Sequence, residues 1–344
     1  QPAAAPKRLL SHQDYDSWRN LQGSAISRDG KFVAYVMQPQ DGDGEFFVKN
    51  VQTGAEWRAP RGYRPPTPPP DPSDPAATAA FAAQGRLLRA SFTADSKYVI
   101  FNIEPTKAEL NKARKEKRKP EDFPKNGIGI MNLANGQVTV VEGVKSFQVS
   151  EDGAGYFAYL RLPGKPEPAA AGAATPPPAA ARPAARRKEY GTELVLRRLS
   201  DGNERSFSDV LDYSLSKDAK TLIFAVSAKN EETNGAFAVP TEGNTAPVSL
   251  LNGPGKYTKF TWDEKETQMA FISDRDDAAA KQPKFKVYHW SRNDPKATEV
   301  VAVNTPGFPS GAVVSEKGSI SFSYDGTRLF VSSAPPADPE PAAE

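Results

Sequence analysis

Hydrophobic and polar residues alternate along this chain in short runs, and the runs come in pairs. Six segments share one pattern: an alternating apolar run, a turn that contains Asp, and a second alternating run. They cover residues 25–36, 90–103, 147–160, 213–226, 259–273 and 320–333, with turn residues Asp29, Asp95, Asp152, Asp218, Asp263 and Asp325. Alternation with a period of two predicts half-buried strands, and Asp-Gly between two such runs is a strong hairpin signal. Each segment is therefore predicted to be a β-hairpin.

A second hairpin is predicted after each of the first five segments. These hairpins cover residues 45–58, 127–141, 192–207, 235–251 and 284–301, and four of them turn at a residue followed by Gly, as at Thr53-Gly54. Two successive hairpins give four antiparallel strands, which is the blade of a β-propeller. The turn Asp residues are spaced by 66, 57, 66, 45 and 62 residues, and the shortest spacing matches the roughly 40–45-residue period of a bare blade.

The fold class predicted from this repeat is all-β, a β-propeller of four-stranded antiparallel blades. The blades begin near residues 25, 90, 147, 213, 259 and 320, and the sixth supplies only its first hairpin. A β-sandwich is the alternative architecture, but it does not explain six similar hairpins in succession. The sixth hairpin should leave a strand edge unpaired, which favours association unless further strands cover it. We expect those strands to come from a continuation of the same polypeptide.

Proline marks the insertions between and within the blades. The chain has 32 Pro, and they gather in windows that are also rich in Ala, which predicts extended, solvated segments. Residues 60–85 are predicted to separate blades one and two, 105–126 to interrupt blade two, and 163–190 to interrupt blade three. The resulting domain organisation is an N-terminal segment over 1–22, the propeller over 23–333 and a Pro-rich tail over 334–344.

Two stretches are predicted to be helical. Residues 11–21 begin with Ser11 as N-cap and place Tyr15 and Trp18 on one face, so Trp18 should dock on the body. Residues 106–119 begin with Thr106 as N-cap and carry a run of six basic residues. The favoured interpretation of this second stretch is a solvated helical excursion. The alternative is a helix that binds a partner or an anionic surface.

Composition and charge exclude several function classes. The chain has 344 residues, 44 Lys plus Arg and 42 Asp plus Glu, for a formal net charge of +2. It therefore lacks the basic field of a nucleic-acid binder, and it contains no apolar run long enough to span a membrane. It has no Cys and only His12 and His289, which excludes thiolate chemistry and a multi-histidine metal site, so no metal or other cofactor is predicted.

The chain's first residues indicate a location. Residues 1–6, QPAAAP, are typical of a mature secreted protein after removal of a signal peptide, although a trimmed chain would look the same. We therefore expect a periplasmic or secreted protein.

No catalytic, cofactor-binding or metal-binding residue is predicted. The nearest string to a G-x-S-x-G elbow surrounds Ser310, but its spacing differs and Pro309 stands beside the serine. His12 lies in a terminal segment and His289 in a predicted strand, so both are interpreted as structural. The charged stretch 274–277 could bind a cation through its carboxylates, but a solvated loop is favoured. The four Trp are assigned to the core rather than to a ligand platform.

Several stretches resemble a known family. Residues 124–160, 191–207, 253–277 and 320–336 are similar to the N-terminal propeller of bacterial secreted serine peptidases of the prolyl oligopeptidase family, and the resemblance extends from Leu10 to Pro336. It implies that an α/β-hydrolase domain of the same protein carries the catalytic residues and that the propeller admits only short peptides. The chain alone is therefore expected to be inactive, with this hydrolase domain as its partner. The alternative is a stand-alone, TolB-like propeller that binds or scaffolds proteins.

Overall fold

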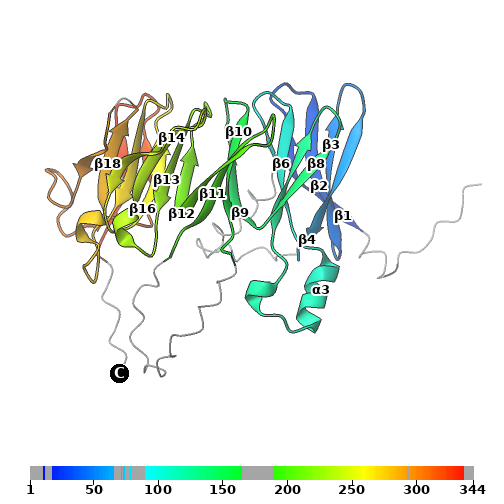
Figure 1. Cartoon of the computed structure of the whole chain (residues 1–344), viewed down its shortest axis with the longest axis horizontal. Coiled ribbons are helices and arrows are strands. Elements are labelled where there is room, and N and C mark those ends of the chain that lie inside the picture. The colour runs from blue at the N-terminus through cyan, green and yellow to red at the C-terminus, as the bar shows by residue number, and fades with distance from the viewer. Residues whose placement is uncertain are drawn as a thin grey trace, which may run out of the picture. The chain divides into compact units, whose positions relative to one another are not determined.

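The computed structural model describes residues 11, 18–65, 71, 73, 78, 90–164, 189–292 and 294–336. The chain divides into two compact units, residues 1–145 and 146–344, and strand β9 (Val144–Val149) crosses their boundary. Regular structure in both units is almost entirely β-strand (Figure 1). Successive four-stranded antiparallel sheets confirm the predicted all-β blade architecture.

The first unit contains two four-stranded sheets, the predicted blades one and two. Blade one consists of β1 (Arg19–Ile26), β2 (Phe32–Pro39), β3 (Asp43–Asn50) and β4 (Glu56–Tyr63). Blade two consists of β5 (Ser91–Phe92), β6 (Tyr98–Ile103), β7 (Gly127–Asn132) and β8 (Val138–Glu142). Each strand pairs with the next one along the chain, so each blade is an antiparallel meander.

Alternating burial along the strands builds the core of the first unit. Strand β2 buries every second side chain, from Phe32 onwards, as the alternation predicts. Phe46 of blade one stacks on Phe101 of blade two with ring centroids 3.9 Å apart. Both rings are essentially fully buried, and burial of such a side chain is worth roughly 1.5–3 kcal/mol. Apolar packing between the sheets therefore holds the first unit together.

The second unit contains one seven-stranded sheet, one four-stranded sheet and two short ones. The seven-stranded sheet runs from β9 through β10 (Tyr156–Arg161), β11 (Thr192–Arg198), β12 (Glu204–Leu215), β13 (Thr221–Val226) and β14 (Gly235–Pro240) to β15 (Val248–Asn252). The four-stranded sheet is blade five, formed by β16 (Tyr257–Trp262), β17 (Gln268–Ser273), β18 (Lys286–Ser291) and β19 (Thr298–Val301).

Blades three and four share a strand, which differs from the separate blades predicted. The first half of β12 pairs with β11 and its second half pairs with β13. The pairing register shifts around Val210, next to Asp209, whose φ is +56°. A bulge bends a strand and increases its twist, so one twelve-residue strand serves as the last strand of blade three and the first of blade four.

The predicted Asp turns share one hydrogen-bonding pattern. The Ser27 hydroxyl donates to Asp29 Oδ1 at 2.7 Å and accepts from the Phe32 N–H at 2.9 Å. The same two bonds recur at three further turns, which begin at Thr93, Ser216 and Ser323. The residue after the Asp has a positive φ in all four turns, and it is Gly30, Ser96, Ala219 or Gly326. Glycine adopts this conformation without steric cost, which accounts for the Asp-Gly sequences.

Two of the six turns depart from this pattern. Asp263 occupies the position of the serine, where its Oδ1 accepts from the N–H groups of Thr267 and Gln268 at 2.8 and 3.0 Å. The prediction that Asp263 takes the place of Asp29 in this turn was therefore wrong by two residues. In the third turn the Asp152 N–H donates to the Lys217 carbonyl at 2.7 Å. A Cβ on Gly153 would lie 2.3 Å from the Asp218 carbonyl, so only glycine allows these two turns to pack this closely.

The sixth repeat forms a single hairpin, as predicted. Strands β21 (Ile320–Phe322) and β22 (Leu329–Val331) make a two-stranded sheet. Beyond β22 the chain turns back, and β23 (Ser333–Ala334) pairs with β20 (Val313–Val314). Within the described residues no third strand joins the outer edge of β22.

The helical predictions have different outcomes. Helix α3 (Lys107–Lys115) confirms the second prediction, and Thr106 and Glu109 form a capping box at its start. The described residues also form three 3₁₀ turns, η1 (Pro120–Asp122), η2 (Glu231–Thr233) and η3 (Arg275–Asp277). The first prediction was wrong at its end, because β1 begins at Arg19, and Trp18 keeps 48% of its surface exposed. Residues 12–17 lie outside the described part. The helices of the described residues include none long and apolar enough to cross a bilayer.

The first insertion begins later than the composition indicated, and the second lies where it was predicted. Strand β4 extends through Pro60 to Tyr63, so the predicted insertion over 60–85 starts too early. Proline fits here because the strand lies at the edge of its sheet. The insertion over 105–126 is confirmed as the excursion between β6 and β7 that contains α3. Most of residues 66–89, all of 165–188 and the tail from 337 onwards lie outside the described residues.

Candidate functional site

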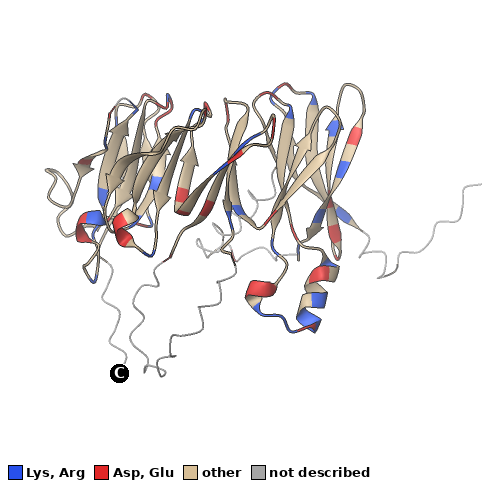
Figure 2. Cartoon of the chain, viewed as in Figure 1, with Lys and Arg blue, Asp and Glu red and all other residues tan. Residues whose placement is uncertain are grey.

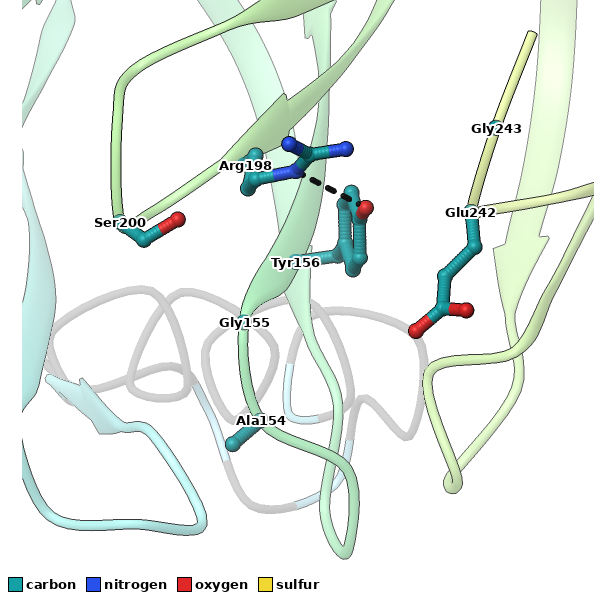
Figure 3. A pocket seen from close by; sticks show the side chains of 7 residues that line it. All are labelled: Ala154, Gly155, Tyr156, Arg198, Ser200, Glu242 and Gly243. Carbon is teal, nitrogen blue, oxygen red and sulfur yellow. Dashed lines mark hydrogen bonds between the residues drawn. The ribbon is translucent and has the colours of Figure 1, made fainter.

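A groove opens at one end of the seven-stranded sheet, where hairpin turns of blades three and four gather. Ala154 and Gly155 lie in the turn between β9 and β10, and Tyr156 begins β10 (Figure 3). Arg198 ends β11, Ser200 lies in the turn after it, and Glu242 and Gly243 lie in the turn after β14. Antiparallel pairing brings these turns together, because the first and second hairpin of a blade reverse direction at the same end. The groove has a volume of about 440 Å³ and is broadly open to solvent.

Arg198 and Tyr156 form the polar centre of this groove. Arg198 Nε donates to the Tyr156 hydroxyl at 3.0 Å, and Nη1 donates to Asp201 Oδ2 at 3.2 Å. The guanidinium also lies over the Tyr156 ring, 5.5 Å from its centroid. The hydrogen bond to Tyr156 raises the pKa of Arg198. A half-exposed arginine held on a tyrosine ring can bind a carboxylate or another small anion, but these groups do not make a catalytic pair.

The described residues include His289 and Ser310, two of the residues weighed for serine chemistry in the sequence. His289 lies in β18, its Nε2 is 2.8 Å from Gln268 Oε1, and its ring meets Phe322 edge-on. Ser310 lies in an exposed turn. The contacts of His289 with Gln268 and Phe322 are compatible with its interpretation as a structural residue. His12 lies outside the described residues.

The carboxylates of residues 274–277 accept hydrogen bonds from donors of the protein itself. Asp276 accepts from Arg275 Nε at 2.9 Å, from Lys286 Nζ at 2.8 Å and from the Tyr288 hydroxyl at 3.0 Å. Asp274 Oδ1 accepts from a backbone N–H, that of Lys256, at 2.6 Å, and burial raises its pKa. The described residues hold no group of three or more side chains suited to a metal ion. The carboxylates of Asp274 and Asp276 are therefore both engaged by donors of the protein itself.

The polar connection between blades four and five was not predicted from the sequence. Glu266 is 5% exposed, and its carboxylate accepts from the backbone N–H groups of Lys217 and Asp218. Arg292 binds Asp218 in a fork, with Nη1 and Nη2 at 2.9 and 3.2 Å. Burial raises the pKa of Asp218, but the hydrogen bonds from Arg292 and Ser216 outweigh it and leave the pKa well below its usual value. The signal in the sequence is Glu266 itself, which stands where three other turns have Gly30, Gly153 and Gly326.

The comparisons with known proteins concern the fold. No protein-family model and no curated protein matches the chain. Among solved structures it is similar to a prolyl endopeptidase (14% identity, TM-score 0.45) and to the β-propeller domain of the Trilobed protease from Pyrococcus furiosus (8%, 0.42). It is also similar to an acylaminoacyl peptidase solved in complex with Z-Gly-Gly-Phe-chloromethyl ketone (9%, 0.42).

The matched structures differ in how much of them the chain spans. The match with the prolyl endopeptidase covers 94% of this chain and 41% of the endopeptidase. The match with the Trilobed protease domain covers 89% of this chain and 76% of that domain. The match with the acylaminoacyl peptidase covers 91% of this chain and 43% of the peptidase. The chain thus spans about two fifths of the length of the two peptidases.

Proposed function

We propose that the chain is the propeller part of a prolyl oligopeptidase-like serine peptidase, where it limits the access of peptides to a hydrolase domain of the same protein. The observation that carries the proposal is where the family-like stretches lie. Residues 124–160 form β7 to β10, residues 191–207 contain β11 and the start of β12, and 253–277 form β16, β17 and η3. The resemblance thus covers consecutive blade strands together with their connections.

The proposal includes a periplasmic or secreted location. It is supported by the resemblance of residues 124–160, 191–207, 253–277 and 320–336 to the propellers of bacterial secreted peptidases.

The polar connections between neighbouring turns support a gating role. In the second unit the Asp152 N–H donates to the Lys217 carbonyl, and Glu266 accepts from the following turn residues. Gln268 Nε2 donates to the Gly326 carbonyl at 2.7 Å. Successive blades are therefore tied turn to turn, and a rigid set of turns can select peptides by size.

A series of peptides of increasing length tests this proposal in the protein that carries both parts. We expect kcat/KM to fall steeply with peptide length, and the fall to become shallower in Asp218→Ala, which removes the fork to Arg292. Glu232→Ala, at an exposed site in η2, is the matched control and should keep the steep fall. Equal kcat/KM at all lengths, or no hydrolysis of any peptide, would overturn the proposal.

A stand-alone binding module is the second candidate function. The groove around Arg198 favours it, because an arginine held on a tyrosine suits a carboxylate ligand. A native polypeptide that ends near Glu344 and binds a carboxylate-bearing peptide, with loss of binding in Arg198→Ala, would support this function instead.

A further inference from the structure

The excursion between β6 and β7 is fixed to blade one at its start. Lys107 Nζ lies 2.6 Å from Asp41 Oδ2, and the Lys107 N–H donates to Asp43 Oδ1 at 2.7 Å. Ala113 is fully buried, while Leu110 is half-buried beside it. One face of α3 is therefore committed to the body of the first unit, and the helix has a defined orientation.

The remaining faces of the excursion are basic and exposed. The basic residues are Lys112, Arg114, Lys115, Lys117, Arg118 and Lys119, and all six are exposed. Figure 2 shows Lys and Arg gathered along α3 and the segment that follows it. Within the described part of the chain Arg118 pairs with Glu116 at 2.7 Å, and the other five have no ion-pair partner.

The charge of this excursion is local. Residues 106–119 contain seven Lys or Arg and two Glu, a net charge of +5, whereas the whole chain carries +2. The rest of the protein is therefore slightly acidic, and the basic surface is a property of this one element. Positive side chains near the C-terminus of α3 also face the negative end of the helix dipole, which stabilises them there.

The outer face of α3 lacks the anchors of a protein interface. Lys112 and Lys115 share it with Ala108 and Asn111, and all four are exposed. Protein–protein interfaces concentrate their binding energy in buried aromatic or aliphatic anchors, and none stands on this face. A cluster of four to eight basic residues without such anchors is suited to a diffuse negative surface, such as the head groups of anionic lipids.

We propose that residues 107–119 are a surface that adsorbs the protein onto anionic lipid bilayers. The complementarity is electrostatic, because α3 has too little apolar surface to enter the acyl region. Adsorption is accordingly reversible and sensitive to salt, since screening shortens the reach of exposed charges to about 10 Å at 0.1 M salt. The proposal is independent of the peptidase assignment.

Co-sedimentation of the full chain with lipid vesicles tests it. We expect binding to vesicles of phosphatidylcholine with about a third phosphatidylglycerol, and no binding to pure phosphatidylcholine. The triple variant Lys112→Gln, Lys115→Gln, Lys119→Gln should lower the partition coefficient roughly a hundredfold, because each basic residue near such a surface contributes about a factor of five. The control Lys229→Gln, Lys265→Gln, Lys296→Gln removes the same charge from exposed sites in the second unit and should leave binding unchanged.

Three results would overturn the proposal. The first is equal binding to neutral and anionic vesicles, and the second is equal loss in the two triple variants. The third is tighter binding of the chain to soluble polyglutamate than to the anionic vesicles, which would indicate an acidic protein partner instead. All six substituted lysines are exposed, and unchanged thermal melting of both triple variants excludes a loss of fold as the cause.

Discussion

Arg61 is a charged side chain with only 2% of its surface exposed. It lies in β4, and its Nη1 donates to Glu104 Oε2 at 2.7 Å, just beyond the end of β6. Burial raises the pKa of Glu104 and lowers that of Arg61, whereas their mutual attraction acts in the opposite direction on each. The pair joins blades one and two at the end from which both insertions of the first unit leave.

Removal of one partner from this pair should be costly. Glu104→Gln leaves the Arg61 charge buried and unpaired, so we expect the free energy of unfolding to fall by about 3 kcal/mol or more. Glu56→Gln, which breaks an exposed bridge to Arg58 in the same blade, should cost less than about 1 kcal/mol. Urea unfolding of both variants measures the difference. Equal losses would show that the Arg61–Glu104 pair contributes no more than a surface bridge.

The acid response of stability should depend on Asp276. Its hydrogen bond from Lys286 is the main cause that lowers the pKa to about 2, from 3.8 in an unstructured chain. A carboxyl with a lowered folded pKa stabilises the protein above its unfolded pKa and loses that contribution as pH falls towards the folded value. We therefore expect stability to decrease between about pH 4 and pH 2, and to decrease less steeply in Asp276→Asn. Parallel pH profiles for the two proteins would contradict this assignment.

Equivalent Asp residues of the repeated turn should contribute differently to the free energy of unfolding. Asp218 and Asp29 both accept from the first turn hydroxyl, but Asp218 is also held by Arg292 of the next blade. Asp218→Ala should therefore lower the free energy of unfolding by about 2–3 kcal/mol, and Asp29→Ala by about 1 kcal/mol. Denaturant midpoints of the two variants decide it. A larger loss in Asp29→Ala would mean that contacts between blades add little.

The sixth hairpin, whose strand β22 has an open outer edge within the described residues, should promote self-association. Strand β22 pairs only with β21 among the described residues, and Phe330 at its centre is 56% exposed. An apolar edge strand is a template for pairing with a second copy. We expect sedimentation velocity to detect oligomers of the chain, and Phe330→Lys to reduce them, because a charged edge opposes pairing. Identical sedimentation profiles for the two proteins would show that β22 is not the contact.

The elements that the sequence predicted correctly are those fixed by local chemistry. The hairpins followed from alternation and turn residues, and α3 from its Thr106 cap, because both depend on neighbours a few residues away. The errors arose where a distant contact decides. Arg19 to Leu21 belong to β1 through pairing with β2, although their local composition suits a helix. The continuity of β12 depends on its partners on both sides.

At the scale of the whole molecule, the fold was easier to predict than the sites. The Asp turns repeat, so six weak signals reinforce one another. The groove around Arg198 joins residues from turns more than 40 positions apart, and the Asp218–Arg292 fork spans 74 positions. No periodicity in the chain marks such contacts. The basic run 112–119 is the exception, since a contiguous charged segment is visible in the sequence itself.

We propose that this chain accompanies a catalytic domain of the same protein without supplying a catalytic residue. Labelling of the native polypeptide with a serine-directed fluorophosphonate, followed by peptide mapping, tests it most directly. We expect stoichiometric label on one serine outside these 344 residues and an unlabelled chain when the 344 residues are treated alone. Label on Ser310, or on any other serine of this chain, would contradict the proposal, and so would a native polypeptide that takes up no label.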